Sequence, residues 1–204
     1  MNILAIGSHP DDIEFGCGGT LLKFAKENHN IFLLVMTDGS EAGDIEMRKK
    51  EQENAAKVLN AKKLFWGGYP DTKLVLNKFM ISSVEEVIAK VQPDEIYVNY
   101  YADTHQDHRV LAECVISAAR YCKKVLFYED FTSINFQPDI FVDIADVLEE
   151  KIVLLKKHHS QVTKKNPTNW DLLESVKALA NFRGFHGKVK YAEGFKAYRY
   201  LKAI

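Results

Sequence analysis

The chain has 204 residues, which is long enough to bury one full hydrophobic core. Its 27 Lys and Arg residues nearly balance its 28 Asp and Glu residues, so there is no broad basic field of the kind that attracts nucleic acid or an anionic membrane. We therefore expect a single domain over residues 1–204 that binds neither nucleic acid nor a membrane.

Short β-rich runs alternate with longer helical patterns along the first two thirds of the chain. Strands are predicted at residues 2–6, 31–37, 63–66, 95–99, 124–128 and 140–142. Helices are predicted between them at residues 18–27, 45–60, 78–91 and 107–122. This alternation predicts an α/β fold with a mostly parallel sheet and helices on both faces.

The pattern changes after residue 143. Two further helical segments are predicted at residues 146–158 and 170–180, and the aromatic run 191–200 is a candidate edge strand. Residues 164–169 are polar and break helix, so a loop near the site is expected there. We see no linker in this region, which keeps the prediction of one domain.

Residues with side chains typical of catalytic or metal-binding sites follow four of the predicted strands. They lie at residues 8–14, 38–44, 67–72 and 100–108. In open α/β sheets, ligands bind in the crevice beyond the carboxyl ends of the strands. These four segments therefore open onto one edge and can form one site.

The first and fourth segments carry most of the titratable groups. Adjacent carboxylates repel and are costly to desolvate, and a divalent cation compensates them. One imidazole and three carboxylates occupy residues 9–14, and residues 105–108 add two imidazoles and one more carboxylate. Together the two clusters predict a metal site.

We assign His9, Asp12 and His108 as the metal ligands. Mixed His and Asp ligands suit zinc, and a catalytic zinc ion keeps three protein ligands and one position for water. We expect one Zn²⁺ per chain, and another divalent metal stays open.

The remaining groups of the clusters suit acid–base catalysis. A metal lowers the pKa of a water molecule, and a free carboxylate beside it can take the proton as the water attacks a carbonyl. Asp11 is the candidate base. His105 is left to stabilise the oxyanion and protonate the departing amine, and Asp107 is expected to hold the His105 ring and favour its charged form.

Residues 16–19, Gly-Cys-Gly-Gly, offer a competing interpretation as a phosphate loop between a strand and a helix. The run lacks the G-x-G-x-x-G spacing and is followed by no P-loop Lys-Ser/Thr. A non-catalytic nucleotide-binding module is therefore kept as an alternative. A metal-dependent hydrolase of another amide or ester is a second alternative.

The motif His-Pro-Asp-Asp-x-Glu at residues 9–14, with His-x-Asp-His at residues 105–108, closely resembles the LmbE-like or PIG-L superfamily of zinc-dependent de-N-acetylases. The resemblance extends to residues 37–39, 48–59, 69–71, 142–144, 159–161 and 191–195. It thus covers nearly the whole chain. It implies a Rossmann-like sheet, the same metal ligands and base, and hydrolysis of N-acetylglucosaminyl conjugates.

The resemblance also bears on substrate binding. It suggests that Arg48 reaches the substrate, although a surface ion pair with Asp44 or Glu51 is an equal alternative. Asp71 and Glu14 are candidate acceptors for sugar hydroxyl groups, or supporting groups of the loops.

One departure from the family pattern is visible. Some members use an arginine from the second half of the chain to orient the aspartate base, and this sequence has no arginine between Arg120 and Arg183. Because the chain is short for this superfamily, a small soluble N-acetylated sugar conjugate is the expected substrate. Family members often form homo-oligomers, but no sequence feature here reports an interface.

Cysteine usage and hydropathy bear on the compartment. The three cysteines form no C-x-x-C pair, which favours neither a disulfide framework nor a thiolate zinc cluster. The first residues contain no basic leader, and no run approaches the length of about eighteen apolar residues that a membrane span needs. We expect a cytoplasmic protein.

Overall fold

The computed structural model describes residues 1–164, 168 and 170–202. Its strands are β1 (Asn2–Gly7), β2 (Asn30–Thr37), β3 (Lys63–Tyr69), β4 (Glu95–Asn99), β5 (Lys124–Tyr128), β6 (Ile140–Asp143) and β7 (Ala192–Tyr200). Its helices are α1 (Asp12–Lys26), the short 3-10 helix η1 (Ser40–Ala42), α2 (Ile45–Val58), α3 (Lys78–Val91), α4 (Gln106–Ala118), α5 (Leu148–Leu155), α6 (His159–Val162) and α7 (Leu172–Gly187).

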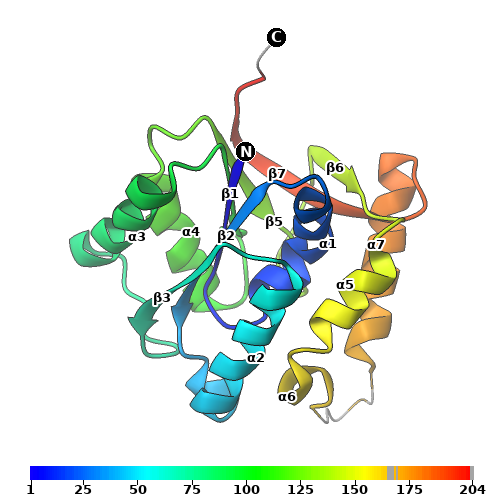
Figure 1. The fold of residues 1–204 in the computed structure, drawn as a ribbon, viewed down its shortest axis with the longest axis horizontal. Coiled ribbons are helices and arrows are strands. Elements are labelled where there is room, and N and C mark those ends of the chain that lie inside the picture. Colours follow the sequence, from blue (N-terminus) through cyan, green and yellow to red (C-terminus); the bar gives the residue numbers. More distant parts are fainter. Residues whose placement is uncertain (165–167, 169, 203–204) are drawn as a thin grey trace.

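All seven strands join one sheet in the order β3-β2-β1-β4-β5-β7-β6 (Figure 1). The pairs from β3 to β5 are parallel, and β7 runs antiparallel to both β5 and β6. The mostly parallel sheet predicted from the alternation is confirmed. The candidate edge strand is wrong in one respect, because β7 lies between β5 and β6 and has partners on both sides.

Two hydrophobic clusters lie on the two faces of the sheet. Helices α3 and α4 cover one face, and α1, α2 and α5 cover the other, with α7 beside them (Figure 1). The central strands β1 and β4 are buried almost throughout. Apolar runs of this kind are expected of strands covered on both faces.

Helix α1 begins earlier than predicted, at Asp12 rather than at Gly18. It is two helical pieces joined at Cys17, whose backbone is not helical (φ −140°, ψ 15°). Glycines at positions 16, 18 and 19 weaken the helical signal in the sequence. The first turn of the helix therefore carries site residues that the sequence pattern had assigned to a loop.

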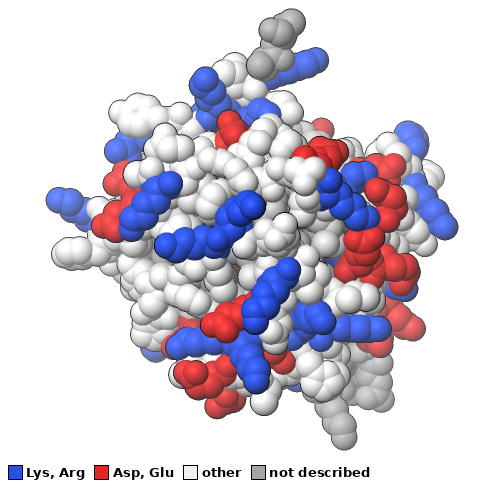
Figure 2. Space-filling view, viewed as in Figure 1, with Lys and Arg blue, Asp and Glu red and all other residues white. Residues whose placement is uncertain are grey.

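The surface carries charges of both signs. On the face shown in Figure 2, Lys and Arg side chains stand beside Asp and Glu side chains. Pairs such as Lys23 with Asp146 and Lys26 with Glu150 tie α1 to the segment around α5. None of the described helices is both long enough and apolar enough to cross a bilayer.

Candidate active site

A cleft of about 420 Å³ opens at the carboxyl edge of the sheet. The four segments that follow the predicted strands, at residues 8–14, 38–44, 67–72 and 100–108, were expected to meet at this edge. Of the predicted site residues, Glu14 and Asp107 lie behind its surface, and these line it: His9, Asp11, Asp12, Arg48, Asp71, His105 and His108.

The loop after β1 is tied to the end of β4. Asn99, the last residue of β4, accepts a hydrogen bond from Ser8 N (3.1 Å) and donates one to Asp12 Oδ2 (3.2 Å). Since β1 and β4 are neighbours in the sheet, a buried amide can reach both loops. Asn99 thereby holds the first cluster against the segment that carries the second.

The donor atoms of the three predicted ligands converge on Asp12. Its Oδ2 lies 3.4 Å from His9 Nδ1 and 3.3 Å from His108 Nε2. A tetrahedral ion with bonds of about 2.0–2.1 Å would separate its ligand atoms by about 3.3 Å. Both separations are compatible with ligands of one such ion. Possible ligand atoms also cluster in other combinations here, His9 with His105 and His108, and Asp12 with His108 and Asp130.

The opposite nitrogen of each imidazole faces carboxylates. His108 Nδ1 lies 3.3 Å from Asp103 Oδ2. His9 Nε2 lies 3.0 Å from Asp71 Oδ1 and 3.3 Å from Asp107 Oδ2. Metal-ligating histidines are held in this way, with a carboxylate on the nitrogen that does not bind the ion.

The carboxylates make this cluster attractive to positive charge. Burial lowers the pKa of His9, but Asp12, Asp107 and Asp71 outweigh it and raise the pKa to about 12. Burial also opposes the charge on His108, yet Asp12 and Asp103 raise its pKa to about 10. The buried Oδ1 atom of Asp107 lacks a hydrogen-bond donor among the described residues. The donor set thus fits a cation.

Asp107 does not play the role expected from the sequence. Its Oδ2 accepts a hydrogen bond from Thr72 N (2.9 Å) and contacts His9, while only its backbone amide meets His105, at Nδ1 (3.2 Å). Burial and the neighbouring His9 and His108 lower the pKa of His105. Asp107 does favour the charged form of His105, but burial, His9 and His108 outweigh it. An accepting Nδ1 leaves the proton of the neutral ring on Nε2.

Arg48 is buried, with 2% of its surface exposed, which excludes the surface pair with Asp44 or Glu51. Its Nη2 donates to Pro10 O and lies 3.4 Å from Asp11 Oδ1. The cation beside Asp11 thus comes from α2 in the first half of the chain. Burial raises the pKa of Asp11 to about 6, and the Arg48 charge opposes that rise.

Glu14 has no exposed surface and supports the cleft from behind. Its Oε1 accepts a hydrogen bond from Gln52 Nε2 (2.7 Å), and its Oε2 lies 3.2 Å from His158 Nε2. The sequence had left Glu14 open as a substrate ligand or a supporting group. The structure places it among supporting groups, and His158 packs there as well.

Sequence reasoning missed several residues of the site, among them Asn99, Gln52, Asp103 and Asp130. Asp130 lies close to Asp12 and His108, and burial and the nearby carboxylates raise its pKa to about 7. Asp130 follows β5 and Asp103 follows β4, so the rule that ligands gather at strand ends could have found both. Gln52 gave no signal, because a polar residue inside an amphipathic helix usually faces solvent.

The glycine run offers no free phosphate loop. Gly19 N (2.8 Å) and Thr20 N (2.7 Å) donate to the carboxylate of Glu193, which caps the second piece of α1. A Cβ at Gly16 would lie 2.0 Å from the ring of Tyr128, so this glycine is needed for close packing. These contacts disfavour the nucleotide-binding alternative.

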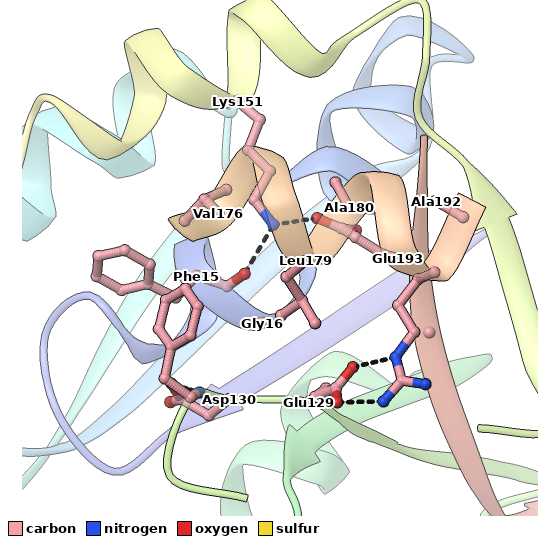
Figure 3. Close-up of a pocket in the computed structure, with 13 residues that line it drawn as sticks. Phe15, Gly16, Glu129, Asp130, Lys151, Val176, Leu179, Ala180, Ala192 and Glu193 are labelled. Carbon is pink, nitrogen blue, oxygen red and sulfur yellow. Dashed lines mark hydrogen bonds and ion pairs between the residues drawn. The ribbon is translucent and has the colours of Figure 1, made fainter. Parts of the chain in front are cut away.

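A second, smaller pocket lies beside the cleft, and both are lined by Phe15, Asp130 and Phe131. Figure 3 shows that Lys151 in this pocket binds Glu193 (2.6 Å) and Phe15 O (2.7 Å). Arg183 and Glu129 also line this pocket, and Arg183 Nε donates a hydrogen bond to Glu129 Oε2 (2.6 Å). These pairs hold α5 and α7 to the sheet, and they place Arg183 on Glu129 rather than on Asp11.

The fold and the site define an α/β protein with a candidate His/Asp metal centre and an adjacent carboxylate at the carboxyl edge of its sheet. Within this class, the family model described as PIG-L, GlcNAc-PI de-N-acetylase, matches residues 4–119, more than half of the chain. The chain belongs to the PIG-L family.

Individual proteins agree with this assignment. The chain is 37% identical over 168 residues to a protein named uncharacterized deacetylase YaiS of Escherichia coli (strain K12), covering 78% of this chain and 90% of that protein. The structure of N,N'-diacetylchitobiose deacetylase from Pyrococcus horikoshii is 26% identical with a TM-score of 0.83, covering 96% of this chain and 82% of that one. A conserved protein of Thermus thermophilus shares the fold, with a TM-score of 0.89 and 24% identity over 100% of this chain and 97% of that one.

Proposed function

We propose that this protein is a zinc-dependent deacetylase that removes an N-acetyl group from a small N-acetylglucosamine-type sugar conjugate. The observation that carries the proposal is the convergence of His9, Asp12 and His108 beside the carboxylate of Asp11. The family supports the reaction, since similar proteins carry the names of deacetylases.

His9, Asp12 and His108 would hold the zinc ion. When bound, the ion would polarise the acetamide carbonyl and lower the pKa of a water molecule. Asp11 lines the cleft and takes the proton of the attacking water on its carboxylate. A carboxylate whose pKa is about 6 is ionised at neutral pH and still basic enough to accept that proton.

His105 is assigned to the oxyanion. Its pKa is lowered, so the ring is neutral and offers the Nε2 hydrogen to the oxygen of the tetrahedral intermediate. A neutral imidazole has no spare proton for the amine. We therefore assign both proton transfers to Asp11, which passes the proton on to the leaving nitrogen.

Arg48 and Asp71 both line the cleft, and we propose that they contact the sugar from its wall. Asp71 accepts from Glu41 N (3.1 Å) with one carboxylate oxygen, and its other oxygen faces His9. The cleft volume of about 420 Å³ suits a small conjugate. We expect a cytoplasmic enzyme.

Acetate release tests the proposal. Purified protein should release acetate from N-acetylglucosamine or N,N'-diacetylchitobiose, lose activity on chelation and regain it with Zn²⁺. Asp11→Asn should keep the metal and lower turnover by about 10²–10⁴-fold. If the protein cleaves other amides or esters but none of the N-acetylated sugars, the proposed substrate class is wrong.

A further inference from the structure

The peptide bond between Pro10 and Asp11 is held at both of its polar atoms by side chains of α2. Its carbonyl oxygen accepts a hydrogen bond from Arg48 Nη2, and its amide donates to Gln52 Oε1 (3.1 Å). Arg48 and Gln52 are four positions apart, so they lie on one face of the helix. One helix face thus fixes the orientation of this peptide plane.

Asp11 has a backbone conformation that residues other than glycine rarely adopt, with φ 104° and ψ −29°. The angles φ and ψ together set how the peptide planes before and after a residue are oriented. The following plane is fixed by α1, because Asp11 O accepts from Phe15 N (3.0 Å). With α2 holding the preceding plane, the two helices together impose this φ on Asp11. Strained residues persist only where the surroundings over-determine them.

Gln52 is itself held in one orientation. Its Nε2 donates to Glu14 Oε1 (2.7 Å), and Glu14 Oε2 faces His158 Nε2 (3.2 Å). Gln52, Glu14 and His158 have no exposed surface. Since Glu14 requires a donor, the amide cannot flip, and its oxygen is directed at the Asp11 amide.

We propose that Gln52 is a positioning residue for Asp11: with Arg48 it clamps the Pro10–Asp11 peptide and thereby directs the Asp11 carboxylate into the cleft. This inference rests on the proposed function, in which Asp11 is the base. Arg48 also touches the Asp11 carboxylate, at 3.4 Å. Gln52 does not, and it acts on Asp11 through the backbone alone, so substituting it separates positioning from direct electrostatic effects.

Gln52→Leu tests the clamp, because it removes both hydrogen bonds at nearly constant volume. We expect kcat to fall by about 10- to 100-fold, with KM and bound zinc close to those of the unmodified protein, because small displacements of a catalytic group have costs of this size. A crystal structure of the zinc-loaded variant should show Asp11 out of the positive-φ region.

Tyr97→Phe is the matched control. It removes a buried hydrogen bond, from Tyr97 to Glu95 (2.8 Å), within β4, whose opposite end at Asn99 meets the site. It should lower Tm without lowering kcat. If Gln52→Leu leaves kcat within twofold of the unmodified value, or leaves the φ of Asp11 unchanged, the positioning role is excluded.

A rescue variant covers the case in which Gln52→Leu does not fold. Gln52→Glu alone brings a second carboxylate against Glu14 and should be poorly active. The exchange Glu14→Gln with Gln52→Glu restores a donor opposite an acceptor, and it should recover at least about tenfold of the lost kcat. An exchange no more active than Gln52→Glu would count against the clamp.

Asp11→Asn, run in parallel, separates this inference from the proposed function. Full turnover by Asp11→Asn would reject Asp11 as the base, whereas the backbone angle of Asp11 in the Gln52→Leu structure would still decide the clamp. Loss of turnover in Asp11→Asn together with normal turnover in Gln52→Leu would reject the clamp alone.

Discussion

Asp103→Asn should weaken metal binding, although Asp103 is not itself a proposed metal ligand. Asp103 is buried, and its Oδ2 lies 3.3 Å from the Nδ1 atom of His108. At an effective dielectric constant of about 20, two unit charges at this separation would interact by about 5 kcal/mol. A ligating imidazole carries only part of a unit charge, so the loss should be smaller. Removing such an outer carboxylate typically lowers metal affinity by about 10–100-fold, or about 1.4–2.7 kcal/mol.

The substitution is conservative for the loop. Asp103 Oδ1 accepts from His105 N (2.8 Å), and an asparagine oxygen can keep that hydrogen bond. Zinc affinity would be measured at pH 7 by competition with a chromophoric chelator. Asp139→Asn is the control, since it also removes one negative charge, from an exposed pair with Lys196. If Asp103→Asn binds zinc within twofold of the control, Asp103 does not support His108.

Three further predictions follow from the site and its packing. Asp11 must be ionised to act, and burial raises its pKa to about 6. We therefore expect kcat/KM to increase as the pH rises through about 6, and a flat profile from pH 5 to 7 would contradict this. The pKa values of about 12 for His9 and about 10 for His108 mean that zinc binding near pH 7 should release about two protons, so affinity rises with pH. Calorimetry in buffers of different ionisation enthalpy measures that number, and release of none would refute the assignment. Gly16→Ala should lower the free energy of unfolding by about 1–3 kcal/mol, because the new Cβ would lie 2.0 Å from the Tyr128 ring. Urea titrations measure this change, and unchanged stability would contradict the prediction.

The location of the site could be predicted from the sequence, because period and composition report strands and their ends. Strands β4 and β5 have the predicted bounds. Residues that follow parallel strands lie at the same edge of the sheet. The sequence alone therefore predicted that His9, Asp12 and His108 lie close together. Motifs this dense in titratable groups also limit the chemistry, since adjacent carboxylates need a cation.

Only the tertiary structure decided which side chains of the site contact one another. Asp107 supports His9 rather than His105, and Arg48 meets Asp11 rather than a surface carboxylate. Gln52, for which the sequence pattern predicts no role, accepts a hydrogen bond from the Asp11 amide. Periodicity tells which face of a helix is buried, but partners separated by dozens of residues depend on how helices pack and which rotamers that packing allows. The sequence therefore identified most residues of the site, whereas the packing of α1 and α2 at the edge of the sheet decided which of them contact one another.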